Sequence, residues 1–175
     1  MSVSEELLDV VDVNDQVIGV KTRGEIHARG LMHRAVHILV FNSRGQLFLQ
    51  KRSLSKDEQP GMWDSSAAGH VDSGEGYLQC AERELDEELG IRVERPLEEM
   101  FKLPAEPLTG NEHCMVYRYC HDGPLVLQAE EIDDGAWLDP GEMDQRVHAA
   151  DSGLTDAIAL IWKRYRENGS NAQGG

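Results

Sequence analysis

One acidic segment constrains the folding of this chain more than any other part of its sequence. Its apolar residues recur at helical spacing and predict one buried face: Leu78, Ala81, Leu85 and Leu89. Gly90 follows at the position where a glycine commonly ends a helix. Three acids, Glu84, Glu87 and Glu88, are spaced so that their side chains share one stripe, where like charges repel. Because a divalent cation would neutralise all three, the sequence predicts a helix that holds a metal ion.

Residues just before this helix complete a longer pattern. Gly69 is followed after five residues by Glu75, and after seven more by residues 83–91, Arg-Glu-Leu-Asp-Glu-Glu-Leu-Gly-Ile. The pattern resembles the box of the Nudix superfamily, G-x5-E-x7-R-E-U-x-E-E-x-G-U, in which U is an aliphatic residue. Every fixed position of that box is filled here, whereas a merely solvated helix face, the alternative interpretation, needs no such spacing.

The Nudix resemblance implies a metal site and catalytic residues at the matching positions. In the family the box glutamates bind metal, often with a main-chain carbonyl at the box glycine, which gives four ligands here: Gly69, Glu84, Glu87 and Glu88. Such oxygen ligands suit Mg²⁺, which we expect first, or Mn²⁺. The resemblance also implies catalytic roles for Glu84 and Glu87. Arg83 is expected to orient a neighbouring glutamate, and Glu75 to stabilise the start of the helix.

The sequence leaves the general base of the implied reaction open. Four glutamates in the box or in later segments are candidates: Glu87, Glu112, Glu130 and Glu131. Glu131 lies shortly before Trp137, as late-loop acids often do in the family, and we include it among the expected catalytic residues. A solvated loop charge is the alternative interpretation of both Glu130 and Glu131.

The implied function is metal-dependent hydrolysis of the diphosphate linkage in a nucleoside diphosphate linked to another group, by water attack at phosphorus. One alternative is isopentenyl-diphosphate isomerase, which shares the Nudix fold. The segment 60–64, Pro-Gly-Met-Trp-Asp, is similar to part of that enzyme. Four polar residues also match it: His27, His33, His70 and Glu112. The isomerase, however, has a cysteine where this chain has Ala68, and a second glutamate where it has Gly110.

Two further interpretations concern binding without turnover. A non-catalytic nucleotide-sugar sensor is the third alternative function, and the intact box argues against it. His27, His33 and His37 have no zinc-like companions in the sequence, so no ligand role is assigned to them, and whether His27 or His33 takes part in the site stays open.

The charge of the chain restricts its partners. With 17 Lys and Arg against 32 Asp and Glu, the net charge is −15, which repels nucleic acid and anionic membranes. A small-molecule phosphate-ester or diphosphate substrate remains the expected partner, and the family implies a homodimer. Three cysteines without a CxxC pair argue against a disulfide framework, and no apolar run approaches membrane-spanning length, so a cytoplasmic protein is expected.

The chain is expected to form one domain over residues 1–167, with residues 1–22 as an N-terminal hairpin and a disordered polar tail at 168–175. Strand-like segments interleave with two predicted helices, the acidic one and a terminal one at 154–165. The strand-like segments are 7–13, 16–22, 35–41, 46–51, 93–103, 112–120 and 133–138. This order predicts the α/β class, and the Nudix resemblance implies an α/β/α sandwich with a mixed sheet.

Overall fold

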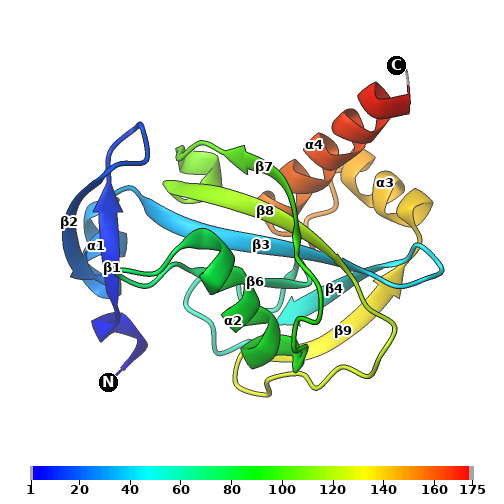
Figure 1. Cartoon of the computed structure of the whole chain (residues 1–175), viewed down its shortest axis with the longest axis horizontal. Helices are drawn as coiled ribbons and strands as arrows, with labels where there is room; N and C mark the ends of the chain where they lie inside the picture. Colours follow the sequence, from blue (N-terminus) through cyan, green and yellow to red (C-terminus); the bar gives the residue numbers. More distant parts are fainter. Residues whose placement is uncertain (1, 174–175) are drawn as a thin grey trace.

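A mixed seven-stranded sheet forms the centre of the computed structural model, which describes residues 2–173 (Figure 1). Five strands follow one another in the order β5-β4-β3-β8-β7, β6 pairs with β3, and β9 pairs with β4. The strands span these residues: β3 His33–Phe41, β4 Leu47–Arg52, β5 Trp63–Asp64, β6 Ala67–His70, β7 Glu98–Leu103, β8 Glu112–Cys120 and β9 Ile132–Leu138. Only the β3 and β8 pair is parallel, as expected for a mixed sheet.

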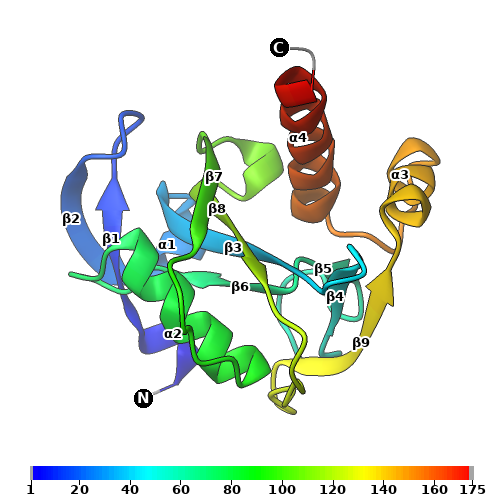
Figure 2. The ribbon, with the colours of Figure 1, turned by 45° about the vertical axis from the view of Figure 1, so that its right-hand side comes forward.

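Helices cover both faces of this sheet, which confirms the predicted α/β/α sandwich. Helix α2, Tyr77–Leu89, packs on one face, and α4, Asp156–Gln173, packs on the other (Figures 1 and 2). Strand β3 explains the arrangement, since Val36, Ile38 and Val40 enter the core under α2 while Leu39 and Phe41 enter the core under α4. A strand buried on both faces is a continuous apolar run, which is how this segment reads in the sequence.

Helix α2 forms where the sequence predicts it and ends at Gly90, whose φ of 67° is left-handed. The predicted apolar face needs one correction, because Leu78 is 48% exposed. The buried face instead includes two acids of the box, Glu84 and Glu88, beside Cys80 and the remaining apolar residues. In the folded chain, the buried face of α2 therefore lies nearer to Glu84 and Glu88 than the spacing of its apolar residues predicts.

A small N-terminal unit packs against one end of the sheet (Figure 1). It begins with a 3-10 turn, η1 Val3–Glu5, and continues with the predicted hairpin of β1 Leu7–Val11 and β2 Val17–Thr22. A short helix that the sequence did not predict, α1 Arg23–Arg29, follows the hairpin. Leu8, Val10 and Ile26 form its own buried cluster. The hairpin turn is joined to the sheet by Asp15, which accepts hydrogen bonds from Arg34 and Lys102.

The C-terminal half differs from the prediction in four places. Residues 93–97 precede β7 and are not part of it, and the chain contains two further helical segments, η2 Pro107–Thr109 and α3 Pro140–His148. The segment predicted as a disordered tail is helical as far as Gln173, because α4 continues through it, and 174–175 lie outside the described residues. No helix in the described part of the chain is long and apolar enough to cross a membrane.

Candidate active site

Arg83 is the centre of the hydrogen-bond network that shapes the box. Its Nε and Nη2 donate to the two carboxylate oxygens of Glu75 at 2.8 and 2.9 Å, and Nη2 also donates to the carbonyl of His70 at 3.3 Å. Its Nη1 donates to Glu84 Oε1 at 2.9 Å and to Glu87 Oε2 at 3.1 Å. The loop before α2 is thus fixed to the helix, and the orienting role expected for Arg83 has a direct geometric basis.

Glu84 lies directly against the backbone of Gly69. A Cβ atom built on Gly69 would stand 2.2 Å from Oε1 of Glu84, so only glycine leaves room for this carboxylate. Burial raises the pKa of Glu84 to about 7, although the charge of Arg83 opposes the change. The predicted metal ligands Gly69 and Glu84 are therefore neighbours in space as well as in the motif.

Glu88 points inward from the last turn of α2. Its Oε1 accepts hydrogen bonds from Gln50 Nε2 at 2.9 Å and from the backbone N–H of Ala68 at 3.2 Å. Burial raises its pKa well above the usual range, and the nearby Glu84 carboxylate adds to the effect. Two buried carboxylates with so little positive charge form an oxygen donor set that a divalent cation fits.

Glu87 occupies a different environment from the other two box glutamates. Its side chain is 51% exposed and is held only by Arg83 among the contacts of the described residues. The sequence predicted one shared stripe of three acids, but burial separates Glu84 and Glu88 from Glu87. Coordination of one ion by all three, with Gly69, stays a prediction.

A second polar cluster lies beside the box, and it brings together the four polar residues that resemble the isomerase in the sequence. One ligand atom from each of four side chains lies within 4.8 Å of the others: His27, His33, His70 and Glu112. They come from α1, the first residue of β3, the last residue of β6 and the first residue of β8. His70 follows Gly69 directly, so this cluster adjoins the box glycine.

The hydrogen bonds of the cluster leave one nitrogen without a partner. His33 Nδ1 lies 2.9 Å from the carbonyl of Leu31, and Nε2 lies 3.4 Å from Glu112 Oε1, whose charge raises the pKa of His33 although burial opposes the change. This Nε2 is buried and has no hydrogen-bond partner among the described residues. An orphaned buried nitrogen facing a carboxylate is the arrangement expected of a metal ligand, whose other nitrogen is commonly oriented by a carbonyl.

Glu112 is the acid that holds this cluster together. It accepts from His70 Nε2 at 2.9 Å and lies 3.4 Å from His33 Nε2. Burial opposes its ionisation, but the two histidines outweigh burial and hold its pKa well below the ordinary value. Parallel pairing of β3 with β8 places His33 opposite Glu112. The available signal in the sequence was that both residues lie at the start of an apolar strand. The only sequence signal for His27 was its place in the isomerase resemblance.

The remaining candidates have separate environments. Glu131 forms an ion pair with Lys56, and Glu130 is exposed in the turn before β9. His37 is buried and lies 2.8 Å from the Ser65 hydroxyl through Nδ1, so it contributes to the core and not to the histidine cluster. Cys80 is fully buried in the core, and burial raises the pKa of its thiol.

Comparison with known proteins gives consistent matches. The chain matches the family model described as NUDIX domain over residues 31–158. It is 43% identical over 135 residues to the uncharacterized Nudix hydrolase PA4841 of Pseudomonas aeruginosa, covering 77% of this chain and 79% of that relative. It is 36% identical over 138 residues to an isopentenyl-diphosphate Delta-isomerase of Serratia proteamaculans, covering 77% of each. The solved structure of DR0079 from Deinococcus radiodurans superposes with a TM-score of 0.81 at 30% identity, covering 91% of this chain and 98% of that one.

Proposed function

The chain belongs to the NUDIX domain family of hydrolases, and we propose that it cleaves the diphosphate linkage of a nucleoside diphosphate linked to another group. The observation that carries the proposal is the pair of buried carboxylates, Glu84 and Glu88, packed against the backbone of Gly69 and Ala68. A site for a divalent ion explains why two like charges are kept so close in a buried position. Mg²⁺ is the proposed cofactor, with Mn²⁺ as the other ion that suits oxygen ligands.

The chain's own residues have distinct roles in this proposal. A divalent ion bound by Glu84 and Glu88, with the Gly69 carbonyl and Glu87, would neutralise charge on the diphosphate. Arg83 holds Glu84 and Glu87 in fixed positions from one guanidinium. The side chain of Glu87 is half exposed and is held by Arg83 beside the buried pair, which supports it as the group that takes the proton from the attacking water. Glu131 is the second candidate base, and it would first have to leave its ion pair with Lys56.

We propose a small-molecule substrate, a cytoplasmic location and a homodimer, with no nucleic-acid or membrane partner. The net charge of −15 disfavours a large polyanion as partner and supports a small substrate that binds together with its own cations.

The test is a substrate screen in ¹⁸O-labelled water with Mg²⁺. The panel contains nucleotide sugars, dinucleoside polyphosphates, coenzyme A, NADH and nucleoside triphosphates. We expect turnover of a nucleoside-diphosphate derivative, with the label on a phosphate product, because the box concentrates positive charge on phosphorus. Label found only on the sugar or alcohol fragment would overturn attack at phosphorus. Binding without turnover across the panel would favour the nucleotide-sugar sensor.

Isopentenyl-diphosphate isomerase is a second candidate function. The cluster of His27, His33, His70 and Glu112 favours it, as does the relative of that name. Against it, the side chain before Gly69 is the methyl group of Ala68, which cannot exchange the proton that allylic isomerisation requires. We therefore expect no deuterium uptake from heavy water into dimethylallyl diphosphate. Uptake by the unmodified protein would promote this candidate over the hydrolase.

A further inference from the structure

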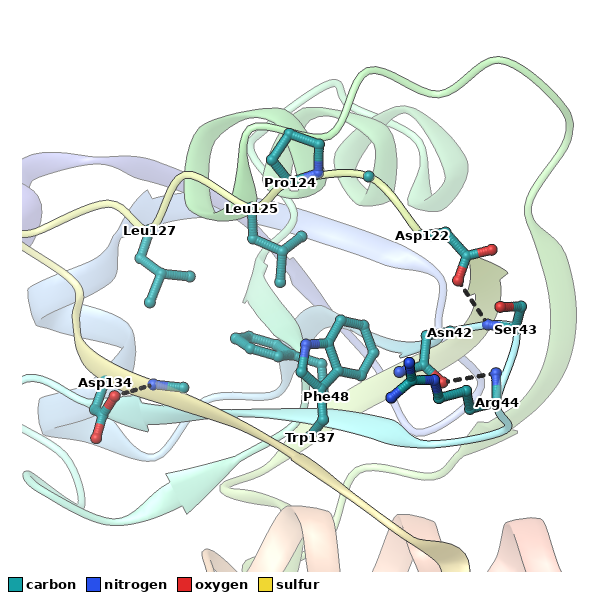
Figure 3. Close-up of a pocket in the computed structure, with 12 residues that line it drawn as sticks. Asn42, Ser43, Arg44, Phe48, Asp122, Pro124, Leu125, Leu127, Asp134 and Trp137 are labelled. Carbon is teal, nitrogen blue, oxygen red and sulfur yellow. Dashed lines mark hydrogen bonds between the residues drawn. The ribbon is translucent and has the colours of Figure 1, made fainter.

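A cavity of about 620 Å³ lies away from both polar clusters, between β4, β9 and the loop that joins β8 to β9 (Figure 3). This volume is typical of small-molecule sites. Phe48 and Trp137 form one wall with their rings edge-to-face, 5.2 Å between centroids. Leu125 and Leu127 of the loop face them from the other side, as Figure 3 shows. The cavity is thus a slot with an aromatic wall and an aliphatic wall.

Polar groups stand at the two ends of the slot. At one end is the exposed Arg44, whose guanidinium has no hydrogen-bond or ion-pair partner among the described residues. The turn that carries Arg44 is fixed there, because the Ser43 N–H donates to Asp122 Oδ1 at 2.8 Å. At the other end, Asp134 Oδ1 accepts from the Gly135 N–H at 2.8 Å, while Oδ2 has no donor in the described part of the chain. The slot therefore offers the Arg44 cation, with the Asp122 carboxylate near it, at one end and the Asp134 carboxylate at the other.

We propose that this slot binds a nucleoside monophosphate at a site separate from the box. The base lies flat between Trp137 and Leu125, its exocyclic amino group donates to Asp134, and the phosphate lies at Arg44. A planar heterocycle suits the slot because aromatic side chains stack on nucleobases without regard to sequence. The Arg44 guanidinium matches a phosphate in charge and geometry. The inference does not depend on the reaction at the box, since no box residue lines the slot.

The loop over the slot is connected to the box helix through the backbone. The N–H of Val126 donates to the carbonyl of Leu89 at 2.9 Å, and that of Gln128 donates to the carbonyl of Glu88 at 3.0 Å. A ligand held between the loop and the sheet would restrain these two hydrogen bonds. Amide exchange of the loop is therefore a readout of binding that does not depend on catalysis.

The experiment is calorimetric titration of the whole chain with AMP in EDTA, paired with hydrogen exchange over residues 122–128. We expect one binding event and slower exchange of the loop amides. Arg44→Ala should weaken AMP binding about tenfold or more and leave the kcat and KM of diphosphate hydrolysis unchanged. Adenosine, which lacks the phosphate, should bind wild type and Arg44→Ala equally. Arg92→Ala, at another exposed arginine, is the matched control and should bind AMP like wild type.

Three results would overturn the proposal. One is the absence of both heat and exchange protection in wild type. Another is equal AMP affinity in wild type and Arg44→Ala. The third is binding that disappears in Glu88→Gln but persists in Arg44→Ala, which would assign AMP to the box. Trp137→Leu should abolish binding, and if that variant fails to fold, Arg44→Ala still decides, because its exposed side chain supports no packing.

Discussion

The carboxylate of Glu84 and the backbone of Gly69 occupy adjoining space so closely that a Cβ atom at position 69 would lie 2.2 Å from Oε1. The glycine of the box is therefore needed for the space it leaves and not for a left-handed backbone. This contact links strand β6 to the acid at the middle of helix α2. Its disruption should affect catalysis before it affects folding.

Gly69→Ala tests this relationship. The added methyl group must displace Glu84, so we expect kcat for the diphosphate substrate to fall by about two orders of magnitude, as when a preorganised charge is lost. Gly141→Ala is the control, because a Cβ there would meet nothing within 4 Å and helix α3 should gain stability slightly. Steady-state kinetics on both variants provides the measurement. Wild-type kcat in Gly69→Ala would show that catalysis does not require Glu84 to stay in this position.

Glu88→Gln should separate catalysis from stability. The amide keeps the shape of the side chain and can still accept from Gln50 and Ala68, but it removes a buried charge. We expect kcat to fall by about two orders of magnitude, while the free energy of unfolding without metal stays level or rises. Urea denaturation in EDTA and kinetics at limiting Mg²⁺ measure the two effects. Glu82→Gln, on the exposed face of α2, is the control, and retention of wild-type turnover by Glu88→Gln would refute its metal role.

The raised pKa of Glu84 predicts the pH dependence of stability in the metal-free protein. Its folded value of about 7 lies above the ordinary 4.5, so the folded state binds more protons than the unfolded state between these values. The free energy of unfolding should therefore decrease as the pH rises from about 4.5 to 7, by about 3 kcal/mol. Denaturation in EDTA across this range is the measurement. Glu84→Gln should make the curve shallower, and the slope that remains should come from Glu88, whose pKa is also raised. An equally steep curve in that variant would exclude Glu84 as a source.

Asp15 should stabilise the contact between the N-terminal hairpin and the sheet. Its side chain is only 8% exposed and accepts from Arg34 Nε, Lys102 Nζ and the Tyr77 hydroxyl at 2.6–2.7 Å. Burial opposes ionisation, but these partners hold the pKa of Asp15 below its ordinary value. Asp15→Ala leaves them unpaired and should lower the free energy of unfolding by about 3 kcal/mol.

Asp15→Asn isolates the contribution of charge from that of the backbone. Position 15 has a φ of 62°, a conformation that asparagine tolerates and alanine does not. Urea denaturation should therefore give a smaller loss for Asp15→Asn than for Asp15→Ala. Asp86→Ala, on the exposed side of α2, should change stability by less than about 0.5 kcal/mol. Equal stability of Asp15→Ala and Asp86→Ala would show that the buried network contributes nothing.

The sequence by itself determined the elements whose signals are local. Helix α2 follows from apolar spacing and Gly90, and β3 and β8 follow from apolar runs between turns. The NUDIX family also follows from the sequence, because its box is one continuous segment. Helix α1, by contrast, carries only Ile26 as a buried apolar residue, which is too weak a periodic signal to predict a helix.

Tertiary structure alone decided which of the predicted side chains meet. Packing of α2 on the sheet buried Glu84 and Glu88 and left Glu87 and Leu78 exposed, a difference that helical spacing cannot give. The cluster of His27, His33, His70 and Glu112 depends on parallel pairing of β3 with β8, on antiparallel pairing of β6 with β3, and on the docking of α1. Such long-range contacts are set by the register between distant strands. No window of the sequence contains that register, because it comes from burying both faces of one sheet at once.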